Sequence, residues 1–189
     1  REPQPRARVT IEDIDFEYVK TPQYELGSNP RTQNTDDDWL RITAEYTAEA
    51  ADEEWLDNVT CNWHVLLIGG ETPRLLMHKS VTYMDIETED PNEKHYATIL
   101  IRPATLKRYY GETRRISERN ILVYLEVLVD KFRIAEYTFA KGNPRVPERW
   151  WQFREPDVNI IEFGLLSRLE TPFAPLDFEV YEYIKPETR

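Results

Sequence analysis

Alternation of hydrophobic and polar residues dominates the first 140 positions of the chain. In the stretch WLRITAEYTAE, Leu40, Ile42, Ala44 and Tyr46 share one phase, and a polar residue stands between each of them and the next. A period of two is the spacing of a β-strand that buries one face. The same spacing predicts a strand over 7–19, a hairpin over 57–86, a short strand within 94–103 and a second hairpin over 120–142.

Details within these stretches predict how the strands bend and turn. The hydrophobic phase changes near Glu12-Asp13, which predicts a bulge or a change of partner. Gly69-Gly70 and Pro73 mark the turn of the first hairpin. Asp130-Lys131 forms the tip of the second hairpin but lacks the glycine of a tight turn, so a longer loop is an open alternative. The stretch PATLKRYYG reads as a short helical turn.

About seven strands at this spacing predict an all-β fold, an antiparallel immunoglobulin-like β-sandwich over residues 1–142. Cys61 is the only cysteine, and it shares a predicted strand with Trp63, so the disulfide of antibody domains is excluded. The inward row of the first hairpin contains Val59, Cys61, Trp63, Val65 and Leu67. We expect the strand after Asn120 to be central, because both of its faces are apolar.

Residues 143–189 have a different texture, rich in proline and aromatic residues. Burying six of their large apolar side chains would be worth about 10 kcal/mol before chain entropy is counted. We therefore expect this C-terminal extension to pack, either on the sandwich or on a partner.

Two adjacent tryptophans, Trp150 and Trp151, stand near Arg149, Phe153 and Arg154 in this extension. Regular strand or helix geometry would point neighbouring side chains in different directions. One interpretation is a covering segment that buries one indole and leaves the other half exposed under arginine side chains. The second is a protein-docking surface, because tryptophan and arginine are enriched in interface hot spots. The third is an aromatic platform for sugars.

Charge is unevenly distributed along the chain, whose net charge is −11. Residues 1–100 carry a net −12, residues 101–154 a net +6 and residues 155–189 a net −5. The acidic balance argues against a nucleic-acid partner. The opposite signs suggest that neighbouring copies meet head to tail. No apolar run approaches the roughly 18 residues of a transmembrane helix.

Candidate catalytic and metal sites are weak. His64, His78, His95 and Cys61 do not have the close spacing of zinc ligands. No nucleophile, metalloprotease or phosphate-loop motif is present in the chain. We therefore expect no enzyme activity and no cofactor.

Three stretches resemble the immunoglobulin-like, pilus-associated secreted proteins of mucin-dwelling gut bacteria: VTIEDIDFEYVKTPQYELG, WLRITAEYTAE and LLSRLETPFAPLDFEVYEY. The resemblance implies a secreted, periplasmic or outer-membrane protein of a type IV pilus-like assembly, without catalytic activity. The sequence begins at Arg1, and we expect a signal or anchor to have been removed.

These observations favour a non-catalytic, extracytoplasmic module that binds a protein partner or itself within a pilus-like or cell-envelope assembly. The predicted partner-binding residues are Arg149, Trp150, Trp151, Phe153 and Arg154. The alternative is a β-sandwich that binds carbohydrate, such as the glycans of mucin.

Overall fold

The computed structural model describes residues 6–22, 38–51, 53–111, 115–140, 143–152, 158–176 and 182–187. Seven long strands come first, interrupted by short helices after β5, and three two-residue strands follow. The strands are β1 (Ala7–Lys20), β2 (Asp38–Ala50), β3 (Trp55–Ile68), β4 (Arg74–Glu87), β5 (His95–Ile101), β6 (Ile121–Val129), β7 (Phe132–Phe139), β8 (Asn159–Ile160), β9 (Leu166–Ser167) and β10 (Tyr183–Ile184). The helices are α1 (Pro103–Thr105), η1 (Leu106–Tyr110), η2 (Glu118–Asn120) and η3 (Arg168–Glu170).

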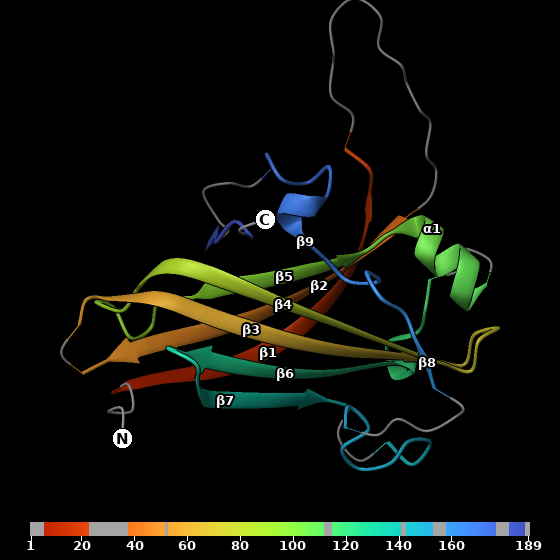
Figure 1. Ribbon diagram of the computed structural model, residues 1–189, viewed down its shortest axis with the longest axis horizontal. Coiled ribbons are helices and arrows are strands. Elements are labelled where there is room, and N and C mark those ends of the chain that lie inside the picture. The colour runs from red at the N-terminus through yellow and green to blue at the C-terminus, as the bar shows by residue number, and fades with distance from the viewer. Residues whose placement is uncertain are drawn as a thin grey trace, which may run out of the picture.

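The strands form two sheets that lie face to face along the long axis of the molecule (Figure 1). One sheet has the order β1-β2-β5-β9, and we call it sheet A. The other, sheet B, has the order β10-β4-β3-β6-β7, with β8 also paired to β4. Every long-strand pairing is antiparallel. The predicted all-β sandwich is thus confirmed, while the immunoglobulin-like strand order stays a prediction.

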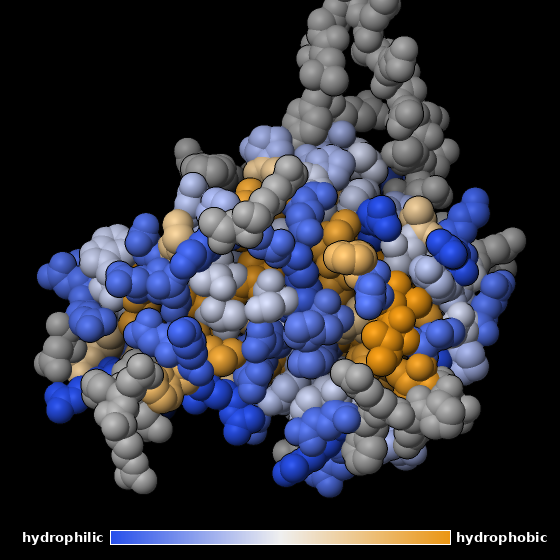
Figure 2. Space-filling view, in the orientation of Figure 1, coloured by the Kyte–Doolittle hydropathy of each residue, from blue (hydrophilic) through white to orange (hydrophobic). Residues whose placement is uncertain are grey.

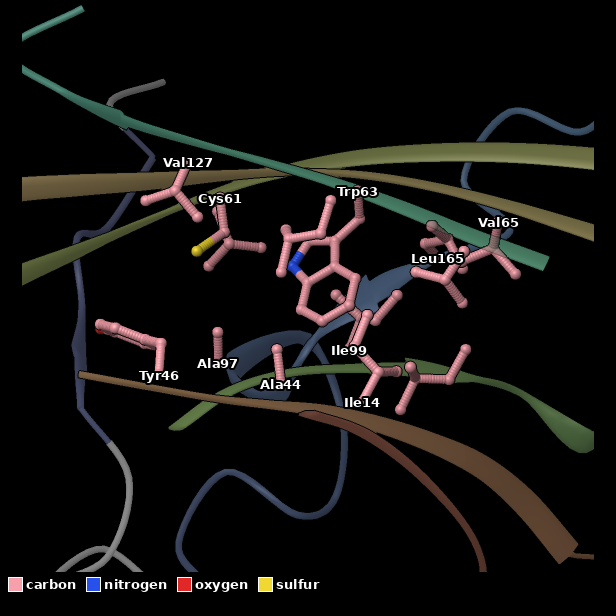
Figure 3. Packing of buried hydrophobic residues seen from close by; sticks show 14 of the residues in the cluster. Ile14, Ala44, Tyr46, Cys61, Trp63, Val65, Ala97, Ile99, Val127 and Leu165 are labelled. Atoms are coloured by element: carbon pink, nitrogen blue, oxygen red, sulfur yellow. The ribbon is translucent and has the colours of Figure 1, made fainter. Parts of the chain in front are cut away.

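The core lies between the sheets and is filled by the inward rows of the predicted strands. Val59, Cys61, Trp63, Val65 and Leu67 are all almost fully buried. Trp63 of sheet B points across the core toward small side chains of sheet A, including those of the two alanines that pair across β2 and β5 (Figure 3). Large side chains opposite small ones allow the sheets to approach at native packing density.

The predicted bulge and helical turn are both present. The pairing of β1 with β2 shifts register between Ile11 and Asp13, where the hydrophobic phase changes. Pro103 begins α1, where its missing N–H is not needed, and η1 ends at Tyr110, directly before Gly111 with φ of 117°. The backbone of η1 binds the β3–β4 turn, because Glu71 donates to the Tyr110 carbonyl at 2.8 Å.

The β6–β7 tip is a two-residue turn, so the longer loop left open by the sequence does not form. Val129 pairs with Phe132, and Asp130 and Lys131 have φ of 49° and 71°. Positive φ at both central positions is the requirement of a primed turn, which matches the twist of the flanking strands. The hairpin holds both side chains in this conformation although neither residue is glycine.

The described part of residues 158–187 is here called the C-terminal segment. It lies along the side of the sandwich where β4 and β5 are the outermost long strands of the two sheets (Figure 1). β8 and β10 pair with β4, and β9 pairs with β5. Leu165 and Ile184 enter the main core. Phe173 packs edge-on against Trp39 at 5.4 Å on the outer face of sheet A. A domain boundary at residue 142 stays a prediction.

Candidate protein-docking surface

The two tryptophans lie on the outer face of sheet B, within residues 143–152, which we call the covering segment. Trp150 is only 6% exposed and packs with Leu66, Leu76 and Leu122. Trp151 is half-buried and stacks on Tyr124 of β6, with ring centroids 3.9 Å apart and nearly parallel planes. This arrangement matches the covering-segment interpretation for the two indoles.

An irregular turn brings both indoles to the same hydrophobic cluster. Arg149 has φ of 72°, and the Gln152 amide donates to the Arg149 carbonyl at 2.9 Å. Regular backbone would have separated the neighbouring side chains. In this turn the indoles instead meet edge to face, with centroids 5.6 Å apart. The two rings therefore pack as one unit on sheet B.

Beside this unit lies an open hollow of about 670 Å³, here called the tryptophan hollow. Its walls come from β6, β7 and the covering segment. Aromatic, charged and polar side chains line it, among them Tyr124, Arg133, Glu136, Arg149, Trp151 and Gln152. A concave surface with an apolar wall and a few polar groups is a typical binding site.

Hydrogen bonds and charges hold the β7 wall of the tryptophan hollow in place. The Tyr124 hydroxyl donates to the Glu136 carboxylate at 2.9 Å. Burial raises the pKa of Tyr124 to about 12, and the bond to Glu136 and its charge add to the increase. Arg133 lies 3.6 Å from carboxylate oxygens of both Glu126 and Glu136. The tyrosine is thus a neutral, fixed support for Trp151 at physiological pH.

Three of the five predicted site residues lie in the part of the chain that the structure describes. Trp150, Trp151 and Arg149 all line the tryptophan hollow, and Arg149 is exposed. Phe153 and Arg154 lie outside the described residues. The role of all five in binding a partner stays a prediction.

Sequence reasoning missed a second apolar surface, on the link between β8 and β9. Phe163 is 79% exposed and has φ of 59°, and Ile160 is 51% exposed. A Cβ on Gly164 would lie 2.5 Å from the sulfur of Met77, so glycine lets this link lie close to β4. The only sequence signal was the motif NIIEFGLL, in which buried and exposed apolar residues are mixed without a period. Figure 2 shows hydrophobic surface gathered over the β8 region.

The histidines and the cysteine do not converge. Among the described residues, no three or more histidine, cysteine or acidic side chains are placed to hold a metal ion. His64 and His78 face each other across β3 and β4 with ring centroids 4.6 Å apart. Cys61 is buried in the core, and burial raises the pKa of its thiol to about 12. Its thiol therefore has little thiolate character.

A protein-family model matches residues 1–188, almost the entire chain. The chain belongs to that family. No curated protein matches the chain by sequence. None of the helices in the described ranges is long and apolar enough to cross a membrane.

One solved structure similar to this family member is a crystal structure of a protein from Akkermansia muciniphila, a mucin-dwelling gut bacterium. The two chains share 21% identity with a TM-score of 0.79. The match covers 99% of this chain and 97% of the other. This likeness establishes a shared fold and agrees with the resemblance to proteins of mucin-dwelling bacteria.

Proposed function

We propose that this family member is a non-catalytic, extracytoplasmic β-sandwich that binds a protein partner within a pilus-like or cell-envelope assembly. The observation that carries the proposal is the half-buried Trp151, fixed on Tyr124 at the wall of the tryptophan hollow. A rigid aromatic anchor beside arginine side chains is typical of an interface hot spot. The exposed Ile160 lies close by, because it pairs with Leu76, which packs with Trp150.

The proposed partner has an extended or protruding segment with an apolar side chain and both signs of charge. Arg149 and Arg133 would meet its carboxylates, while Glu136 and Glu148 would meet its basic groups. The hollow has room for one or two large side chains, and Trp151 offers the apolar contact. Localisation outside the cytoplasm is part of the proposal and is tested by fractionation of the source cells.

Capture from solubilised envelope fractions tests the proposal with three chains: the wild type, Trp151→Ala and Trp55→Ala. Trp55 is the matched control, because it is an exposed tryptophan at the far end of β3. We expect the wild type and Trp55→Ala to capture the same protein. The purified partner should bind Trp151→Ala at least about tenfold more weakly, as loss of a hot-spot aromatic requires.

Equal binding by all three chains, with Trp151→Ala still folded by circular dichroism, would refute the proposed surface. A partner found only in the cytoplasmic fraction would refute the proposed location.

Carbohydrate binding is the second candidate, and the polar rim of the same hollow favours it. A half-exposed indole beside Gln152, Glu136 and Arg133 could stack on a sugar ring and bond its hydroxyls. The exposed surface of Trp151 is reduced, however, because Tyr124 covers one face of the indole. A glycan array with the wild type and Trp151→Ala separates the candidates: binding of mucin-type glycans by the wild type alone would favour the carbohydrate role.

A further inference from the structure

Acidic side chains gather at one end of the sandwich. This acidic end consists of the described residues of 6–8, 49–57, 85–94 and 130–131, where the start of β1, the β2–β3 and β4–β5 connections and the β6–β7 turn meet (Figure 1). Acids outnumber bases there by ten to four, a net of −6. The acids are Glu49, Glu53, Glu54, Asp57, Asp85, Glu87, Glu89, Asp90, Glu93 and Asp130; the bases are Arg6, Arg8, Lys94 and Lys131.

Basic side chains gather at the opposite end. This basic end consists of the described residues of 20–22, 38, 69–74, 102–111, 115–120 and 143–147, around α1, η1, η2 and the β3–β4 turn. Bases outnumber acids there by eight to three, a net of +5. The bases are Lys20, Arg74, Arg102, Lys107, Arg108, Arg115, Arg119 and Arg145; the acids are Asp38, Glu71 and Glu118.

Backbone and side-chain hydrogen bonds hold each end together as one surface. At the acidic end, Thr88 donates from its amide to the Glu54 carbonyl and from its hydroxyl to the Glu53 carbonyl, both at 2.8 Å. These bonds join the two acidic connections. At the basic end, Arg145 donates to the side chain of Asn120 and to the carbonyl of Arg119, so the covering segment is joined to η2.

We propose that the acidic end binds the basic end of a second copy of this chain, head to tail. The two surfaces differ and lie at opposite ends of one axis, so the contact is heterologous and repeats into an open row. Nucleic acid and anionic lipid are less favoured occupants of the basic end, because a chain of net charge −11 repels them. A second copy instead presents an acidic end that is complementary to the basic end. This inference deepens the proposed assembly role and rests on it.

Distance explains how copies of equal net charge can attract. A 14-residue strand such as β3 spans about 45 Å, so the centres of joined copies are several Debye lengths apart at about 0.1 M salt. Repulsion between net charges is then largely screened. The facing ends lie within a few ångströms, where attraction persists until the Debye length shrinks to about 3 Å near 1 M salt.

Sedimentation of the purified chain at several ionic strengths tests the proposal. We expect the average mass to rise above the monomer value of 22.5 kDa with protein concentration near 0.1 M salt and return to it near 1 M, as screening demands. In one variant, Arg108→Glu and Arg119→Glu lower the net charge of the basic end from +5 to +1. In the other, Glu54→Lys and Glu89→Lys change the net charge of the acidic end from −6 to −2. Each variant alone should be monomeric.

Mixing the two variants tests the proposed contact most directly. Each variant keeps one unaltered end, with a net charge of −6 in the first and +5 in the second, so an equimolar mixture should regain association as pairs of unlike chains. The matched control carries Asp15→Lys and Glu162→Lys, which make the same charge change as the second variant but on the flanks of the sandwich; it should associate like the wild type.

A chain that stays monomeric at every ionic strength, or a control that loses association as the variants do, would overturn the proposal. The Trp151→Ala chain separates this inference from the docking function: it should lose the envelope partner and keep self-association. Loss of self-association in that variant would place the contact at the tryptophan hollow instead.

Discussion

His95 and Glu182 form a buried contact between a sheet strand and the C-terminal segment. The imidazole Nδ1 lies 2.5 Å from the Glu182 carboxylate, and His95 is almost fully buried. Burial alone lowers the pKa of His95, but the hydrogen bond to Glu182 and the charges of Glu182 and Glu93 outweigh it, so the pKa is raised. The folded state thus holds the His95 proton more tightly than the unfolded chain does.

The consequence for stability has a definite sign. The contribution of the pair is fully present below the unfolded pKa of about 6.5 and is lost as the pH rises through the higher folded pKa. We expect Glu182→Gln to lower the free energy of unfolding by about 1–3 kcal/mol near pH 5.5 and by less near pH 9. Denaturant titrations at both pH values measure this difference.

Glu187→Gln is the control for this experiment. It removes one carboxylate from the same segment, whose partner is Lys79 at 3.3 Å. Its effect should not change over this pH range, because the pair contains no histidine, the side chain whose ordinary pKa lies between pH 5 and 8. A Glu182→Gln effect that is equal at both pH values would contradict the assigned role of His95.

His64 has the opposite effect to His95 on the pH dependence of stability. Burial, and then the nearby His78, lowers the pKa of His64 to about 4. The unfolded chain then binds more protons than the folded one between about pH 4 and 6.5, so this residue favours unfolding as the pH falls through that range. The effects of His95 and His64 on stability therefore partly cancel in mildly acidic solution.

At the scale of elements, the β6–β7 turn offers a direct test of backbone strain. Asp130 and Lys131 both adopt left-handed backbone, which costs a side chain such as lysine more than glycine. Asp-Gly is a preferred pair for this turn. We expect Lys131→Gly to raise the free energy of unfolding by about 0.5–1 kcal/mol in denaturant titrations, because the strain relieved exceeds the entropy added to the unfolded chain.

Lys131→Ala provides the comparison, since it removes the same charge and keeps a Cβ. It should leave stability nearly unchanged. A gain from alanine equal to that from glycine would assign the effect to charge, and a loss from glycine would contradict the strain argument.

The long strands could be predicted from sequence because each has a buried face with a period of two. Leu40, Ile42, Ala44 and Tyr46 are buried in the phase that the pattern indicates. β8, β9 and β10 could not be predicted, since two residues carry no period and their pairing depends on strands already assembled. The turn that brings Trp150 and Trp151 together depends on positive φ at Arg149, for which the sequence has no glycine signal.

At the scale of the whole molecule, the covering and C-terminal segments are joined to the sandwich by burial as well as by pairing. They cover Leu66, Leu76 and Leu122 on sheet B and Trp39 on sheet A. We expect a chain that ends at Gly142 to lose its cooperative thermal transition and to aggregate, because it would expose these side chains and the edges of β4 and β5.

Circular dichroism and light scattering during heating measure this outcome. A chain that ends at Glu187 is the control, because it keeps β10, and it should melt like the full chain. A soluble 1–142 fragment with a cooperative transition would instead establish the predicted boundary between two domains.

The C-terminal pieces that pair with β4 and β5 also determine when folding can finish. A ribosome makes β4 and β5 well before β8, β9 and β10, so a growing chain holds two unsatisfied sheet edges until its last strands appear. Pairings between residues so far apart in the chain also form slowly. Nascent chains of this protein should therefore need a holding chaperone, and prematurely terminated products should be recognised and degraded.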